Sequence, residues 1–453
     1  MLRRVAYASL PRDPRDVRLL HHVGGGVVIA AVRYAPVASR PLFFSVVEMS
    51  APNERAAPLR IVHVRVPQPA TEVSSIVLLR SADGAEVFVV VQAAERPRVG
   101  APATSTTTYV YRRQLVVEDS GSEGAGDEEA SVDLVSSPPT SVALPTTAAR
   151  VRYQRMPRAH TSADAAPWTA AAAFYPSANA LTGASATGAA ASVAAFVTVS
   201  GDGSGSSSSG GGGAGCQLRL WQLTGTRVTL EAAWTVPALA GFAVREVLTL
   251  PGTQDVVLLR HHSSVVEVDL AAVRSACAHG GAVTGNTFLS RAWRWSAHEQ
   301  LTACAVKDAL LYAATESGAV LVWDLRRPTT AAGLSCGGPP PQRSAELRAP
   351  ITGLHAPYAT GFITCDACGG VRDWRERGEA EEEEEAEAAA SRVLHDVGGA
   401  AAAAAVAAGA FPYRSRAPVE APTGEEGCAA MHGHDNFVAV VGECGRLCLY
   451  FCD

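Results

Sequence analysis

The segment LLYAATESGAVLVWD, residues 310–324, decides the fold of this chain. Two apolar, β-rich runs, 310–314 and 319–323, flank a short polar turn that contains Gly318. Alternate residues of a strand point to opposite faces, and glycine permits the backbone of a tight turn. Small side chains such as Ala313 leave room for neighbouring sheets to pack closely. The segment therefore predicts one antiparallel hairpin.

The same hairpin recurs along the chain and gives seven copies. The other copies lie at 196–221, 361–374 and 437–453, and at 27–34 with 42–49, 86–93 with 107–116, and 255–262 with 265–270. A repeat of ~40–50 residues is typical of a β-propeller, in which each repeat forms one blade. We therefore predict an all-β fold, a single seven-bladed β-propeller over residues 1–453.

The two ends of the sequence predict how the ring closes. The last hairpin ends at Asp453 and leaves no residues for a fourth strand, whereas residues 3–9 read as one strand without a hairpin partner. Unpaired strand edges invite aggregation, so pairing the two segments would protect both. We expect residues 3–9 to form the outer strand of the last blade.

The repeats resemble those of the WD40 family. The resemblance rests on Trp323-Asp324, on residues 200–203 with Trp221, and on Ala297-His298 ahead of the next repeat. It implies four-stranded blades, with the hairpin as strands b and c, and a hydrogen bond from a histidine before the blade to an acid in the b–c turn. His298 and Glu316 match that pair approximately. The structural repeat positions that the resemblance implies are Asp202, Trp221, His298, Glu316, Trp323, Asp324 and Trp374.

Within this family the chain is similar to the small propeller nucleoporin of the Y-shaped outer-ring complex. The similarity lies in residues 362–374 and 438–451, which a long divergent connection separates, and in the N-terminal strand that closes the ring. It implies a monomeric propeller within a hetero-complex at the nuclear pore. Propellers of the mitotic checkpoint and mRNA-export type, dynein intermediate chains and vesicle-tethering adaptors have comparable patterns and stay open as alternatives.

Four segments exceed a standard blade, namely 118–149, 203–215, 271–287 and 378–427. They are rich in Ser, Gly, Pro, Ala and Glu. Such compositions bury too little apolar surface to become ordered. We therefore predict that these insertions are mostly disordered loops.

Charge is unevenly distributed along the chain. The formal net charge is −6, from 38 bases and 44 acids. Residues 118–133 and 379–387 each hold seven acids and no base, so the other 30 acids face 38 bases. An arginine-rich body of this kind suits an acidic partner, with nucleic acid as a competing possibility. We expect the acidic runs to be solvated loops.

Residues with catalytic or metal-binding potential do not form a recognisable constellation. Cys365 and Cys368 form a Cys-x-x-Cys pair, but it falls in a b–c turn and no second pair follows, so we expect packed cysteines instead of zinc. Cys448 and Cys452 are expected to pack between blades. The chain lacks a G-x-S-x-G elbow, and no lysine follows the Gly/Ser tract 203–215. The sequence predicts no catalytic residue, no metal and no cofactor, and hence a protein that is not an enzyme. An enzyme is the less favoured alternative, since propellers can host sites built from residues far apart in the sequence.

Targeting and cysteine patterns favour an intracellular protein. The N-terminus reaches Pro11 before an apolar signal core can form, and the alanine-rich run 399–410 is far below the ~20 residues that cross a bilayer. All ten cysteines lie at or after Cys216 with irregular spacing, which favours a reducing compartment. We therefore expect a non-catalytic protein-interaction scaffold of a multiprotein complex, cytoplasmic or nuclear, with no membrane span and with other protein subunits as partners.

Overall fold

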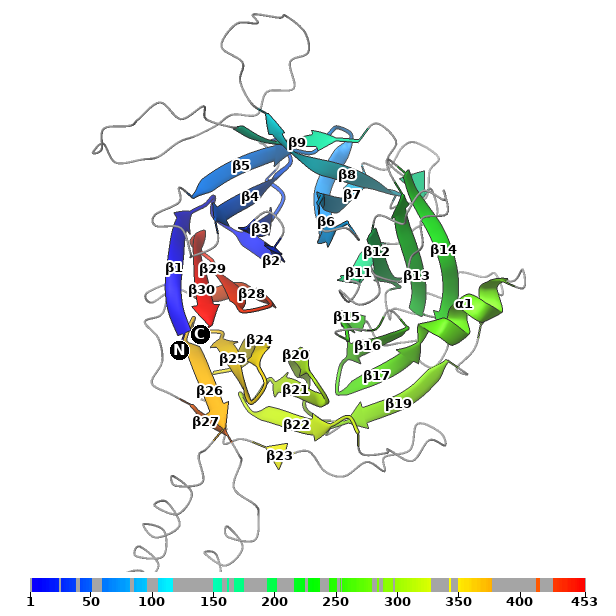
Figure 1. The fold of residues 1–453 in the computed structure, drawn as a ribbon, viewed down its shortest axis with the longest axis vertical. Helices are drawn as coiled ribbons and strands as arrows, with labels where there is room; N and C mark the ends of the chain where they lie inside the picture. The colour runs from blue at the N-terminus through cyan, green and yellow to red at the C-terminus, as the bar shows by residue number, and fades with distance from the viewer. Residues whose placement is uncertain are drawn as a thin grey trace, which may run out of the picture.

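Seven small β-sheets stand in a ring, and each sheet is one blade (Figure 1). The all-β class and the seven-bladed propeller are therefore confirmed. We number the blades 1 to 7 in chain order. The computed structural model describes residues 2–23, 26–37, 41–50, 59–81, 85–95, 105–116, 150–156, 161–162, 167–174, 194–201, 216–224, 227–236, 244–250, 253, 255–278, 283–284, 288–295, 298–326, 342–343, 349–376, 413–415 and 427–452.

The first three blades occupy the N-terminal half of the chain. Blade 1 contains β2 (Pro14–His22), β3 (Val27–Tyr34), β4 (Phe43–Ser50) and β5 (Arg60–Arg65). Blade 2 contains β6 (Ala70–Arg80), β7 (Val87–Glu95) and β8 (Ser105–Val116), with β9 (Arg150–Arg155) and β10 (Thr161–Ser162) both paired to β8. Blade 3 contains β11 (Trp168–Phe174), β12 (Ala194–Ser200), β13 (Cys216–Thr224), β14 (Arg227–Val236) and β18 (Val283–Thr284).

The other four blades complete the ring. Blade 4 contains β15 (Val244–Thr249), β16 (Val256–His261), β17 (Ser264–Asp269) and β19 (Leu289–Arg294). Blade 5 contains β20 (Leu301–Lys307), β21 (Leu310–Thr315), β22 (Val320–Asp324) and β23 (Gln342–Arg343). Blade 6 contains β24 (Ile351–Tyr358), β25 (Gly361–Asp366), β26 (Val371–Glu376) and β27 (Tyr413–Ser415). Blade 7 contains β28 (Cys428–His434), β29 (Phe437–Gly442), β30 (Arg446–Cys452) and β1 (Leu2–Ser9).

All seven predicted hairpins are present as the two middle strands of a blade, for example β21–β22 and β29–β30. These middle strands read as almost continuous apolar runs because the neighbouring blades cover both of their faces. Residues 87–91 of β7 are all buried. Outer strands alternate instead, as in β9, where Tyr153 is buried and its neighbours are exposed.

The ring closes through the two ends of the chain, as predicted. β1 pairs antiparallel with β30, from Leu2 opposite Cys452 to Ser9 opposite Arg446. The two termini lie side by side at the edge of blade 7 (Figure 1). Leu2 packs into the apolar cluster between blades 6 and 7, and Ala8 into the cluster between blades 7 and 1. The closing strand therefore contributes to two inter-blade cores.

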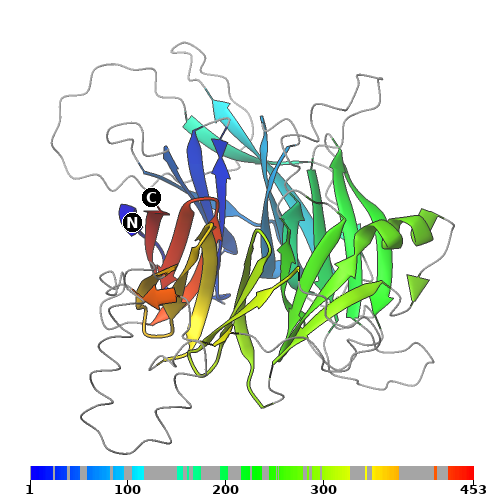
Figure 2. The ribbon, with the colours of Figure 1, turned by 60° about the horizontal axis from the view of Figure 1, so that its bottom comes forward.

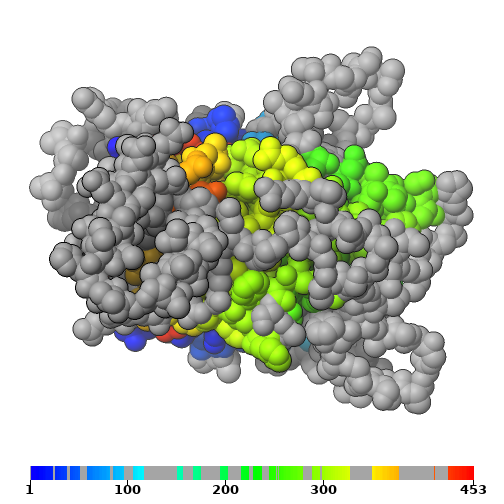
Figure 3. Space-filling model, turned by 90° about the horizontal axis from the view of Figure 1, so that it is seen from below, coloured from blue at the N-terminus to red at the C-terminus, as the bar shows by residue number. Residues whose placement is uncertain are grey.

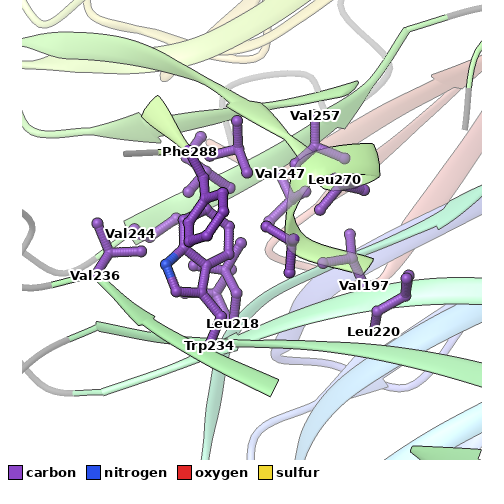
Figure 4. Close-up of a cluster of buried hydrophobic side chains, with 14 of the residues drawn as sticks. Val197, Leu218, Leu220, Trp234, Val236, Val244, Val247, Val257, Leu270 and Phe288 are labelled. Atoms are coloured by element: carbon purple, nitrogen blue, oxygen red, sulfur yellow. The ribbon is translucent and has the colours of Figure 1, made fainter. Parts of the chain in front are cut away.

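Apolar clusters between adjacent blades form the core. The largest lies between blades 3 and 4, where Trp234 packs edge-on against Phe288 with ring centroids 5.2 Å apart (Figure 4). Val197 and Leu218 of blade 3 face Val257 of blade 4 in the same cluster. Each blade is thus held by the burial of its two faces against its neighbours.

Two of the predicted loops contain regular structure. The insertion 271–287 instead holds most of the helix α1 (Leu270–Ala278), which lies at the outer edge of blades 3 and 4 (Figure 2), and the strand β18, which pairs with β14 in blade 3. The Asp269 carboxylate accepts a hydrogen bond from the N–H of Ala272 at 2.9 Å and caps this helix. Leu270 and Val273, three residues apart, are buried on one helix face, and this gives the segment the apolar anchor that its composition obscures.

The insertion 378–427 likewise contains β27, which pairs with β26 and completes blade 6. Tyr413 supplies its anchor, because this ring is buried against Tyr312 and Phe362. The insertions 118–149 and 203–215 lie outside the described residues.

Blades 6, 5 and 4 succeed one another along the side of the molecule that Figure 3 presents. Across the described ranges, no helix is long and apolar enough to span a bilayer.

Candidate functional site

Trp221 and Trp374 occupy equivalent places in blades 3 and 6. Each indole donates its Nε1–H to a threonine hydroxyl on the adjacent strand, Thr198 or Thr364, at 2.9 Å. Each also lies nearly parallel to a phenylalanine ring, with interplanar angles of 14° and 16°. These two repeat positions therefore join strands b and c inside a blade.

Trp323 of blade 5 is also buried, but Ala313 occupies the place that threonine takes in the other two blades. The carboxylate of Asp324 accepts hydrogen bonds from the backbone N–H and the guanidinium of Arg326, at 2.9 and 3.2 Å. Asp324 thus stabilises the turn that follows β22. Asp202 lies outside the described residues.

Glu299 connects the b–c turn of blade 5 to the segment that precedes the blade. Its carboxylate accepts a hydrogen bond from Trp295 Nε1 at 2.7 Å and another from the hydroxyl of Ser317. His298 and Glu316, the pair that the WD40 resemblance implies, are both exposed. Glu299 therefore links the same two segments as the expected pair. Here the acid lies before the blade, and its hydrogen-bond partner Ser317 lies in the b–c turn.

The cysteines are divided between core and surface. Cys365 is buried and Cys368 is exposed. A hydrogen bond with Cys428 and burial raise the pKa of the Cys365 thiol. Cys448 and Cys452 are buried in the cluster between blades 6 and 7, as predicted. Within the described parts of the chain, no three His, Cys, Asp or Glu side chains are grouped as metal ligands would be.

The central channel is a cavity of about 400 Å³, lined by the innermost strands of all seven blades. Apart from the exposed Arg245, charged side chains in its wall have polar partners. Arg260 Nε donates to Glu246 Oε2 at 2.8 Å, and the same oxygen accepts the N–H of Cys304 at 3.0 Å. Asp16 lies 3.2 Å from Arg18. The bonds of Glu246 therefore join β15 to β16 and β20, whereas Asp16 and Arg18 pair within β2.

Asp435, in the β28–β29 turn at the channel, lies among histidines. Its carboxylate is 3.2 Å from His21 Nδ1 and 3.3 Å from His434 Nδ1, and its carbonyl oxygen is 2.8 Å from His355 Nε2. Burial alone would raise the pKa of Asp435, but the hydrogen bonds with His21 and His434 hold it well below its ordinary value. The turn is therefore tied to blades 1 and 6.

Two further channel histidines are uncharged links between blades. The backbone N–H of Leu19 donates to His432 Nδ1 at 3.1 Å, so this nitrogen must be unprotonated. Burial and the neighbouring Arg18 hold the pKa of His432 well below 6.5, and burial lowers the pKa of His355 to about 4. A Cβ at Gly433 would lie 1.9 Å from the His355 ring, so the close contact requires glycine there.

A second hollow, the rim groove, has a volume of about 360 Å³ and lies between β5 of blade 1 and β9 of blade 2 at the outer rim of the ring (Figure 1). Both strands are edge strands of their sheets. Arg65, Arg152 and Arg155 line the groove and are exposed. Among the described residues that line it, none is acidic. Unlike the channel, the groove thus presents positive charge without a negative counterpart in its wall.

The floor of the rim groove is apolar and rigid. Val62, Val64 and the rings of Tyr111 and Tyr153 form it, and all four side chains are buried. The Tyr111 hydroxyl donates to the backbone carbonyl of Arg65 at 3.2 Å, which ties β8 to β5 across the groove.

A buried charge pair lies beneath this floor. Glu48 of β4 accepts two hydrogen bonds from the Arg113 guanidinium of β8, both at 2.9 Å, and one from the hydroxyl of Tyr153. The side chains of Glu48 and Arg113 are only 4% and 12% exposed. Bidentate arginine–carboxylate pairs have a fixed geometry, so this bridge sets the position of blade 2 against blade 1.

The rim groove was not predicted from the sequence, although the basic excess outside the acidic runs was. The signal is present in residues 60–65, RIVHVR, and 150–155, RVRYQR, which place arginines around apolar residues in two short strands. Both segments are typical of edge strands with one face solvated. Their adjacency depends on the ring and is not visible in the sequence.

Comparisons with known proteins identify no family for this chain. No family model matches the sequence, and no curated protein matches it. Among solved structures it is similar to a crystal structure of BBS1N in complex with ARL6DN, soaked with mercury. That similarity covers 99% of this chain and 96% of the other, with 9% identity and a TM-score of 0.45.

Proposed function

We propose that this protein is a non-catalytic protein-interaction scaffold, a single propeller within a hetero-complex. The observation that carries the proposal is the rim groove, where exposed arginines surround a buried apolar floor without an acidic residue in the described wall. Protein interfaces combine an apolar centre with polar surroundings, and arginine is enriched in them. The groove has this composition on a rigid support.

The carboxylates of the channel also favour a scaffold over an enzyme. A catalytic acid or base needs a group free to exchange protons with a substrate. Here Glu246 bonds Arg260 and a backbone N–H, and Asp435 is surrounded by histidines. These carboxylates serve the ring itself, which favours binding over catalysis.

The finer proposal is a structural nucleoporin of the nuclear pore outer ring. It rests on the sequence resemblance of residues 362–374 and 438–451. The closing strand β1, which that resemblance also implies, is present. A fluorescent fusion should then concentrate at the nuclear envelope, and a diffuse or vesicular distribution would favour the other adaptor propellers.

Affinity purification tests the scaffold proposal directly. The tagged full-length chain, purified from cells in the presence of nuclease, should bring down one or more proteins at near-stoichiometric yield. The proposal fails if the chain is recovered alone, or if its partners disappear on nuclease treatment. It also fails if the purified protein turns over a substrate and changes at Glu246 or Asp435 abolish that activity.

A further inference from the structure

We infer that the rim groove binds an acidic, extended peptide segment of a partner protein. The inference rests on the proposed scaffold function and names the chemistry of its partner. It combines three observations on the groove, namely unpaired positive charge, an apolar floor and a fixed geometry. Each limits the occupant in a different way.

The positive charge of the groove favours an anionic ligand. Arg65 lines the groove from β5, and Arg152 and Arg155 line it from β9. Across the described part of the chain, none of the three forms an ion pair with a carboxylate. His63 also lines the groove, but burial lowers its pKa and its Nδ1 lies 2.7 Å from the hydroxyl of Ser45. The positive charge therefore comes from arginine and does not depend on pH near neutrality.

The apolar floor of the groove favours a ligand that carries apolar side chains beside the acidic ones. Val62, Val64 and Tyr153 form this floor inside a volume of about 360 Å³. Gln68 and Gln154 on the walls are exposed and carry amides that suit a peptide backbone. In an extended peptide, successive side chains point to opposite sides, so alternating residues can meet the floor and the arginines. An Asp/Glu-rich segment with interspersed apolar residues fits both surfaces.

The walls of the groove are positioned before any ligand arrives. Pairing with β4 holds β5, pairing with β8 holds β9, and the Glu48–Arg113 bridge joins the two blades beneath the floor. The hydrogen bond from the Tyr111 hydroxyl to the carbonyl of Arg65 fixes the main chain of that arginine. A preformed groove reduces the entropy that a bound peptide must lose.

The same features disfavour nucleic acid as the occupant. Single-stranded nucleic acid binds where bases stack on accessible aromatic faces along a basic track. The rings of Tyr111 and Tyr153 are only 2% and 6% exposed, and their hydroxyls are engaged in hydrogen bonds inside the protein. They line a closed floor instead of offering a stacking platform.

Fluorescence anisotropy with the full-length chain tests the inference. The probe is a short fluorescein-labelled peptide in which Glu alternates with Leu, and its control has Gln in place of Glu. We expect the Glu peptide to bind at least about tenfold more tightly than the Gln peptide. The double variant R65E/R152E should weaken binding of the Glu peptide by at least about tenfold as well.

A matched variant controls for net charge. Arg12 and Arg446 are exposed and lie away from the groove, on the connection after β1 and at the start of β30. R12E/R446E changes the formal charge by the same amount and should leave peptide binding within about twofold of wild type. Thermal melts of both variants verify folding. Equal loss in both variants, or equal binding of the Glu and Gln peptides, overturns the inference.

Two other outcomes would assign the groove to a different occupant and overturn the inference as stated. One is binding of the Glu peptide only after deletion of residues 118–133, the acidic run between β8 and β9, which would make this chain its own ligand. The other is tighter binding of single-stranded RNA that R65E/R152E abolishes. Purification of R65E/R152E from cells separates the two proposals: a complex that persists leaves the scaffold function intact and removes the groove from it.

Discussion

The central channel and the rim groove use the same ionisable side chains in opposite ways. In the channel, Glu246 and Arg260 bond each other and backbone groups, and Asp435 lies between two histidines. Arg245 is an exposed exception in that lining. In the groove, three arginines face solvent over an apolar floor. Charge used in closing the ring is therefore unavailable for binding, whereas charge on the outer edges stays available.

The Glu48–Arg113 bridge marks the boundary between these two uses of charge, because it is buried and Glu48 bonds Tyr153 of the groove floor. We expect Glu48→Ala to destabilise the protein by about 3–5 kcal/mol, since it leaves a buried guanidinium without its counter-charge. Urea unfolding of wild type and variant measures the difference. This is the largest effect that the comparison predicts.

Glu86→Ala is the matched control for that variant. Glu86 pairs with Arg112 on the same blade, but the two side chains are 30% and 46% exposed. Solvent screens such a pair, so its loss should cost no more than about 1 kcal/mol. Similar losses of unfolding free energy for Glu48→Ala and Glu86→Ala would show that burial does not distinguish structural charge from charge available for binding. The contrast between channel and groove would then be wrong.

The channel histidines predict an intermediate, pH-dependent effect. The folded-state pKa values of His355, about 4, and of His432 lie below the value of 6.5 for an unfolded histidine. The unfolded chain therefore takes up protons first as the pH falls, and stability is lost from about pH 6.5 downwards. Around His355 the other charged groups are His434, Asp435 and Lys307. Asp435 is ionised in both states near pH 5, so it does not contribute there.

We expect these two histidines together to reduce the free energy of unfolding by about 2 kcal/mol between about pH 7 and pH 5, less than full burial would give because they face the channel. The double variant His355→Gln with His432→Gln should lose at most about half as much over the same range. Urea unfolding at both pH values measures this. Identical pH profiles would show that the channel histidines are not the titrating links.

Much of the fold could be predicted because the relevant signals are local. Each hairpin carries its own apolar runs and turn, and the closing strand follows from an unpaired segment at each end. The helix α1 was missed because its two buried anchors, Leu270 and Val273, stand in an alanine-rich segment that reads as low complexity. β27 was missed for a similar reason, since its buried anchor Tyr413 follows a long acidic and alanine-rich stretch.

The candidate site was harder to predict because it belongs to two blades. Arg65 and Arg152 are separated by three strands of blade 2 and a long insertion in the sequence, yet they line one groove. Glu48, Arg113 and Tyr153 likewise come from three strands. Periodicity reports which residues of one strand share a face. It does not report which two strands meet at the rim.

The smallest expected effect concerns the exposed arginines themselves. Arg65→Ala and Arg152→Ala should each change the free energy of unfolding by no more than about 0.5 kcal/mol, because neither side chain is buried or paired with a carboxylate in the described chain. Arginine stems can cover apolar surface, which sets the upper end of that range. Urea midpoints with unchanged slopes would confirm it, since an altered slope would indicate a change in the surface exposed on unfolding. A loss above about 1 kcal/mol in either variant would place that arginine with Arg260 and Arg113 among the charges that hold the ring. If stability is unchanged while binding of the acidic peptide falls, these arginines serve recognition and not folding.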